Sequence, residues 1–102
     1  MAVDFEEIIK AIANPTRRQM LGWLKDPEKH FGPQHPEHPL CDGVCVGKFV
    51  EKTGLSQSTV SAYMDSLQRA GLVTARRRGQ WTFYKRNDET IADFIESIGA
   101  EL

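Results

Sequence analysis

The chain has 102 residues, which is enough for one domain with one hydrophobic core. Hydrophobic residues make up 40% of it, and no apolar run approaches the roughly 20 residues that a bilayer span requires. Residues 1–7 are acidic and contain no apolar segment. The sequence therefore predicts neither a signal peptide nor a membrane partner.

The formal net charge of −1 conceals an uneven distribution. Residues 56–86 carry six basic side chains against one acidic side chain, whereas residues 87–102 carry five acidic side chains and no basic one. A local basic face attracts phosphate whatever the total charge is. The near-neutral total therefore does not exclude a nucleic-acid partner.

The first part of the chain predicts two helices. Apolar residues at helical spacing indicate an amphipathic helix over 3–13. The pair Asn14-Pro15 is typical of an N-cap and first helical position, and the second helix should reach about Lys25. Thr16, Arg17 and Arg18 fall in its first turn, where cations oppose the helix dipole. They are either placed for a partner or part of an ordinary solvated face.

Residues 26–42 predict a long loop. Four prolines and a glycine argue against a regular helix or a central strand there. Loops of this length in compact domains tend to be functional or mobile. The segment also holds all three histidines, His30, His35 and His38. A flexible solvated loop is the default interpretation, and a zinc site is the alternative.

The centre of the chain predicts a helix-turn-helix core over 53–72. A short third helix over 44–52 precedes a turn on Gly54, and Ser56 is a good N-cap for the following helix. Gly71 is expected as its C-cap. A helix with small polar residues on its exposed leading face suits insertion into a DNA major groove. Its apolar stripe consists of Val60, Met64 and Leu67.

The last part predicts a β-hairpin over 73–86 and a helix over 89–98. The strands are rich in β-branched and aromatic residues, and arginines lead into the hairpin tip. The expected fold is mainly α with a small β-hairpin, a winged helix-turn-helix in the order α-α-α-α-β-β-α within a single domain, 1–102. Helices 3–13 and 89–98 carry more apolar residues than a core of this size needs, so we expect a homodimer formed through them.

The chain resembles the ArsR/SmtB family of bacterial dimeric repressors. Four stretches carry the resemblance: 11–21 (AIANPTRRQML), 53–61 (TGLSQSTVS), 67–73 (LQRAGLV) and 76–84 (RRRGQWTFY). The resemblance implies a winged-helix homodimer in the bacterial cytoplasm. It also implies that this dimer binds a palindromic operator and represses transcription until an inducer releases it.

The departures from the family pattern concern the inducer site. Many members carry a Cys-x-Cys at the start of the third helix that binds soft metal or arsenite; Cys45 matches the first position, but Gly47 occupies the second. A further thiol, Cys41, lies four residues upstream. Other members bind zinc between their last helices through Asp and His, and residues 87–102 contain no His. That zinc site is therefore not expected.

Two groups of side chains are candidates for the DNA surface. Gln can pair bidentately with adenine, and hydroxyl groups bond either bases or phosphates. Arg favours phosphates and the narrow minor groove, although side chains alternate along a strand, so that three consecutive arginines cannot all face DNA. The aromatic residues of the hairpin are expected to pack in the core and the hairpin. The candidates are Gln57, Ser58, Thr59 and Ser61 on the recognition helix, Arg76, Arg77, Arg78 and Gln80 on the wing, and Thr16, Arg17 and Arg18.

Three interpretations of Cys41 and Cys45 stay open. The thiols could form a site for arsenite or a soft divalent metal, completed by the histidine-bearing loop or by a second subunit. They could form a redox switch, because a thiol near a helix N-terminus is more readily ionised and more reactive. They could also be without function, with Cys45 packed as a small apolar residue.

The sequence shows no catalytic arrangement, so an enzyme is not expected. We expect a homodimeric repressor of a palindromic operator that is released by a thiol-sensed signal, either soft metal, arsenite or an oxidant. The alternatives are a winged-helix module for protein-protein interaction without DNA binding, and a DNA-binding repressor with no metal or redox sensing.

Overall fold

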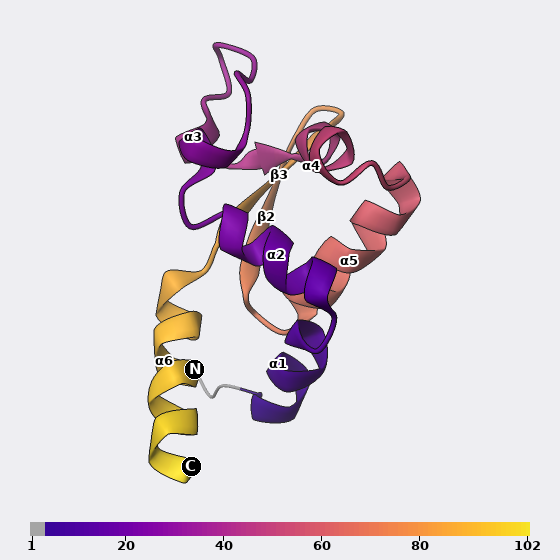
Figure 1. The fold of residues 1–102 in the computed structure, drawn as a ribbon. Coiled ribbons are helices and arrows are strands. Elements are labelled where there is room, and N and C mark those ends of the chain that lie inside the picture. Colours follow the sequence, from indigo (N-terminus) through magenta and orange to yellow (C-terminus); the bar gives the residue numbers. More distant parts are fainter. Residues whose placement is uncertain (1–3) are drawn as a thin grey trace.

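The computed structural model describes residues 4–102, so residue 3 of the expected first helix lies outside the described part. Figure 1 shows the expected sequence of elements, four helices followed by a hairpin and a last helix, with three small additions. This order is that of the expected winged helix-turn-helix. No helix within residues 4–102 is both long and apolar enough to cross a membrane. The elements are α1 (Phe5–Ile12), α2 (Pro15–Trp23), α3 (Pro27–His30), η1 (Leu40–Asp42), β1 (Val44–Cys45), α4 (Val46–Thr53), α5 (Gln57–Arg69), β2 (Val73–Arg78), β3 (Trp81–Arg86) and α6 (Asp88–Glu101).

Helix α5, on the right in Figure 1, packs against α1, α2, α4 and β2. Its predicted apolar stripe is confirmed, because Val60, Met64 and Leu67 are all 0% exposed. Tyr84 of β3 joins the same core. Burial raises the pKa of the Tyr84 phenol above its usual value, and the negative charge of Asp65 acts in the same direction.

The two ends of α5 are held by local hydrogen bonds. At its start, the Ser56 hydroxyl accepts from the Thr59 N–H at 3.2 Å, as predicted for an N-cap. At its end the prediction was wrong by one residue: Ala70 is the C-cap, and Gly71 follows it with a φ of 80°. Gly71 and Leu72 donate back to carbonyls of the last turn at 2.9 Å each. This is the Schellman arrangement, which places glycine just after the cap.

The sheet has three antiparallel strands in the order β1-β3-β2. Strands β2 and β3 form the predicted hairpin, the wing, with Arg78 opposite Trp81 next to its tip. Strand β1 was not predicted: Val44 and Cys45 were assigned to the start of the third helix, but they pair with Tyr84 and Phe83, and α4 begins at Val46. Their extended conformation depends on these distant partners, so no local pattern signals it.

The prediction that residues 26–42 contain no helix is also wrong in part. Pro27 begins α3, a single helical turn. Proline is favourable at that position because the first N–H of a helix has no partner to lose. Phe31 then enters the core, with its ring centroid 6.0 Å from that of Trp23 and 5.0 Å from that of Phe49. The segment is therefore anchored near its start.

Residues 33–43, which follow this anchored part and end one residue beyond the predicted loop, contact the sheet. We call them the covering loop. The Gln34 side-chain N–H group donates to the carbonyls of His38 (2.6 Å) and Gly43 (3.0 Å), and its oxygen accepts from the Cys45 N–H at 3.1 Å. The His38 ring centroid lies 4.7 Å from that of Phe83, which is 2% exposed. Gln34 and His38 therefore tie the loop to the sheet, while most of its other side chains are exposed.

The covering loop explains why two adjacent aromatic residues of β3 are both buried. Neighbouring residues on a strand point to opposite faces of the sheet. Tyr84 faces the helical core, and Phe83 faces the covering loop. Gly43 allows the close approach, because its φ is 130° and an added Cβ would lie 2.9 Å from the Phe83 Cβ.

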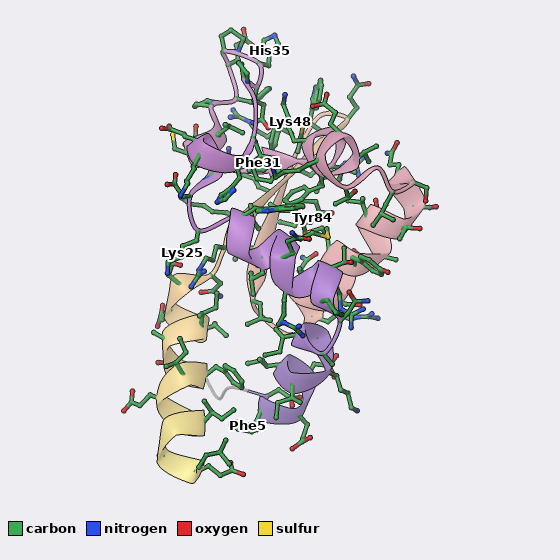
Figure 2. The ribbon with its side chains drawn as sticks, in the orientation of Figure 1. Phe5, Lys25, Phe31, His35, Lys48 and Tyr84 are labelled. Carbon is green, nitrogen blue, oxygen red and sulfur yellow. The ribbon has the colours of Figure 1, made fainter. Side chains whose placement is uncertain are left out.

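The terminal helices use part of their apolar faces inside the chain. The ring centroids of Phe5 and Phe94 lie 5.4 Å apart, and Ile8, Ile91 and Phe94 are buried. Figure 2 shows Phe5 beside α6. The sequence predicted that these helices carry more apolar residues than the core needs, and the exposed remainder includes Ile95, which is 60% exposed.

Both arginines at the start of α2 donate hydrogen bonds to carbonyls at the end of α1. Arg17 donates to the carbonyls of Ala11 (2.7 Å) and Lys10 (3.0 Å), and Arg18 donates to that of Ile12 (2.6 Å). The last carbonyls of a helix lack intrahelical partners, so these bonds complete α1. The Arg17 guanidinium carbon also lies 5.5 Å from the centroid of the Tyr63 ring on α5.

We expect Arg17→Ala to lower the free energy of unfolding by about 1–2 kcal/mol, because two charge-assisted hydrogen bonds and a cation–π contact are lost. Denaturant unfolding of the DNA-free protein measures the change. Arg78→Ala is the matched control, since its side chain is exposed on the wing. Equal stability of the two variants would contradict a structural role for Arg17.

Candidate nucleic-acid interface

The first turn of α5 presents one unengaged polar side chain. The Ser56 hydroxyl lies 3.2 Å from that of Ser58 and 2.9 Å from that of Thr59, so these two predicted DNA contacts are engaged at the N-cap. Gln57 is exposed and makes no side-chain hydrogen bond within residues 4–102. Ser61 is half-buried one turn later. Gln57 is therefore the side chain of this turn that is most free to bond a base.

The three wing arginines divide between the two faces of the hairpin. Arg76 is opposite Phe83 and Arg78 is opposite Trp81, so these two arginines share the face on which the covering loop lies. Arg76 also donates to the Asp42 carbonyl at 3.5 Å. Arg77 is opposite Thr82 on the other face, and its Nε donates to the Gly79 carbonyl at 3.3 Å. The expected alternation holds, and it separates Arg77 from its neighbours.

A polar cavity of about 500 Å³ joins the recognition helix to the wing. We call it the reading groove. It brings together three of the predicted DNA contacts, Gln57, Arg77 and Gln80. An amide and a guanidinium, groups that can bond bases and phosphates respectively, thus line one groove. Its full lining is Cys45, Val46, Gly47, Gln57, Arg77, Gln80, Trp81 and Thr82.

The predicted contacts on α2 lie outside the reading groove. Arg17 and Arg18 are held by carbonyls of α1, and the N–H of Thr16 is bonded at 2.8 Å by the Asn14 side chain. Trp81, in contrast, was assigned to packing but is 43% exposed at the rim of the groove. Its position beside the hairpin tip, next to Gln80, is the sequence signal that could have identified it.

The two thiols do not converge on one site. Cys41 is exposed and shares a cavity of about 250 Å³ with Tyr84 on the helical side of the sheet. Cys45 is buried and opens toward Trp81 and Phe83 on the side of the covering loop. No group of three or more His, Cys, Asp or Glu side chains within residues 4–102 is arranged to hold a metal ion. In this arrangement Cys41 and Cys45 do not fit a chelating site.

Comparison with known proteins agrees with this geometry. Residues 43–75, which include the helix-turn-helix, match the family described as bacterial regulatory protein, arsR family. The chain is 44% identical over 94 residues to YbzH, an uncharacterized HTH-type transcriptional regulator of Bacillus subtilis, covering 89% of this chain and 94% of that protein. It is 33% identical over 90 residues to the putative arsenical resistance operon repressor ArsR2 of Halobacterium salinarum, covering 88% and 64% respectively.

A solved structure resembles the fold over most of its length. It is the homodimeric winged helix-turn-helix DNA-binding domain of a possible ArsR-family transcriptional regulator from Mycobacterium bovis. The TM-score is 0.65 at 26% identity, and the match covers 94% of this chain and 77% of the other. The family consists of transcriptional regulators and not of enzymes. The chain therefore belongs to the arsR family of bacterial regulatory proteins and is a transcriptional regulator with a DNA-binding winged helix-turn-helix.

Proposed function

We propose that this protein is a homodimeric repressor that binds a palindromic operator in the bacterial cytoplasm. The observation that carries the proposal is the reading groove, whose lining includes Gln57 of the recognition helix together with Arg77 and Gln80 of the wing. In this arrangement α5 enters the major groove while the wing follows the phosphate backbone. The relative from Halobacterium salinarum is named a putative repressor, which supports repression as the outcome of binding.

The candidate contacts divide by chemistry. Gln57 is placed to read bases, because a free amide can bond adenine bidentately. Arg77 and Gln80 bond the backbone beside it, with Arg76 and Arg78 along the wing. Ser58, Thr59 and Ser61 add hydroxyl contacts at the start of α5. Thr16, Arg17 and Arg18 contribute chiefly charge and position, because their strongest bonds are made inside the chain.

The exposed remainder of the terminal helices supports the dimer. Ile9 and Ile95 are large apolar side chains that are 36% and 60% exposed, on helices that already pack together through Phe5 and Phe94. A second copy would cover them and place two recognition helices on successive half-sites. Two wings per complex would also double the phosphate contacts that a single chain offers.

We expect the double variant Arg77→Ala with Arg78→Ala to weaken binding to all DNA sequences and to flatten the salt dependence of binding. Sites selected from random duplex DNA would serve as ligands in fluorescence anisotropy across a salt series. Gln57→Ala is the contrasting variant: it should change the selected sequence while leaving the salt slope nearly intact. An unchanged slope in the double variant would remove the wing from the interface.

We expect Ile95→Glu to shift the protein toward monomer, because a carboxylate would have to be buried in the subunit interface. Sedimentation velocity measures the assembly state, and circular dichroism checks that the helices are retained. Ser97→Glu is the matched control, as it adds the same charge at an exposed position of the same helix. If both variants stay dimeric, the interface lies elsewhere.

The inducing signal is proposed to act at the thiols. Cys45 is the N-cap of α4 and pairs with Phe83 of the wing, so a change at its sulfur would reach both parts of the DNA-binding unit. Because Cys41 and Cys45 open to different faces of the sheet, chemical modification by an oxidant fits this arrangement better than chelation of arsenite or a soft metal. Cys41 is the accessible thiol, which peroxide would convert to a sulfenic acid with release of water.

We expect peroxide to lower the DNA affinity of the reduced wild-type protein and expect reductant to restore it. Arsenite and zinc are tested in parallel, with Cys41→Ser and Cys45→Ser as single variants. Loss of the peroxide response in one variant identifies the sensing thiol, and a response to arsenite or zinc alone would favour a metal site that assembles on binding. If no treatment changes affinity, thiol sensing fails while the DNA-binding proposal stands.

A further inference from the structure

A second cavity lies between the covering loop and the wing. None of the proposed DNA-contacting residues lines it. Its volume is about 280 Å³. The walls come from the covering loop, from the start of α4 and from β3, so it opens on the outer face of the sheet. We call it the outer cavity. Its lining is Pro33, Gln34, His35, His38, Cys45, Gly47, Lys48, Glu51, Trp81 and Phe83.

The inner wall of the outer cavity is made of flat rings. Trp81 and Phe83 are stacked with an interplanar angle of 20° and a centroid separation of 6.3 Å. His38 lies across Phe83 at 4.7 Å, with an interplanar angle of 37°. Pro33 adds a further apolar ring at the lining. Such walls favour a planar apolar guest, because ring faces and edges offer offset-stacked and edge-to-face contacts.

A cation is held at the rim of this wall. The Lys48 side chain is only 16% exposed, whereas that of its neighbour Glu51 is 71% exposed. Their charged atoms lie 3.5 Å apart, which is longer than the 2.7–2.9 Å typical of a strong charge-assisted bond. The Lys48 ammonium lies near Gly32, 3.9 Å from where an added Cβ would stand, and both Lys48 and Glu51 line the outer cavity. Figure 2 shows Lys48 below His35, at the same end of the molecule.

The covering loop, which forms one wall of the outer cavity, carries a buried polar atom without a hydrogen-bond partner in the described part of the chain. The Nδ1 atom of His38 is buried and has no hydrogen-bond partner within residues 4–102. Buried polar atoms of this kind are uncommon and cost free energy, so the closed position of the loop is not fully satisfied.

We propose that the outer cavity binds a small planar aromatic carboxylate. The aromatic ring lies against Trp81, which is 43% exposed, beside the His38 ring that covers Phe83. The carboxylate accepts from Lys48. The volume is slightly below the roughly 300–1,000 Å³ of sites for drug-sized ligands, so the guest has one or two rings. The site does not depend on the proposed operator or on the thiol signal. Trp81 also lines the reading groove, so an occupant touches a residue of the DNA-facing surface.

Benzoate is the probe for the test, used with the full-length protein in the absence of DNA. Two analogues separate the recognition elements: benzamide keeps the ring without the charge, and cyclohexanecarboxylate keeps the charge without the flat ring. The indole N–H resonances report on location, because Trp81 lines the cavity while Trp23 packs on Phe31 and serves as the internal reference. We expect benzoate to shift the Trp81 signal saturably and to leave that of Trp23 unchanged.

Two variants test the assignment. Lys48→Gln removes the proposed partner of the carboxylate and should weaken benzoate binding by about tenfold, as expected for one charge-assisted hydrogen bond. Lys10→Gln makes the same change on an exposed residue of α1 and should have no effect. Gly47→Leu fills the cavity from α4, where the nearest atom to an added Cβ is the Cys45 sulfur at 3.9 Å, and it should abolish binding while keeping the fold.

Several results would overturn the proposal. A Trp81 resonance that does not respond to benzoate shows that the outer cavity takes no such guest. Equal binding of benzamide, or an unaffected Lys48→Gln variant, removes the carboxylate from the proposal. Equal binding of cyclohexanecarboxylate removes the flat ring. Each readout is independent of DNA affinity, so failure here leaves the proposed operator binding untouched.

Discussion

The burial of one stripe of α5 governs the rest of the structure. Val60, Met64 and Leu67 are completely buried, and the surrounding helices and the wing pack around them. Since a helix is rigid, fixing its inward residues also fixes its outward ones, so core packing itself aims Gln57 outward. The same helix supplies hydrophobic stability and the reading face. A change at the stripe would therefore disturb both stability and recognition.

Strand β3 connects this core to the covering loop on the other face of the sheet. Tyr84 faces the helices, while Phe83 faces the covering loop that Gln34 and His38 hold in place. Cys45 pairs with Phe83 and begins α4, so loop, wing and helix-turn-helix meet at this residue. Any chemistry at this junction acts on elements that also border the reading groove. The proposed thiol signal and the reading groove thus share one small sheet.

The electrostatics of the chain depend on which cations are free. Arg17 and Arg18 complete the end of α1, so their hydrogen bonds are already used inside the chain. Arg77 and Arg78 on the exposed wing are less constrained, and the basic charge of residues 56–86 is concentrated there. A net charge near zero is compatible with DNA binding because only one of the 14 acidic residues falls within 56–86, whereas five lie on the C-terminal helix.

The sequence by itself determined the winged helix-turn-helix, the stripe of α5, the N-caps at Asn14 and Ser56, and the hairpin, because these depend on periodicity and on contacts between near neighbours. Tertiary structure decided what depends on distant partners. Strand β1 exists because Val44 and Cys45 meet β3, and the covering loop is ordered because His38 finds Phe83. The groupings of Gln57 with Arg77, and of Lys48 with Trp81, arise the same way. Such contacts join residues more than 15 positions apart, for which no local propensity can account.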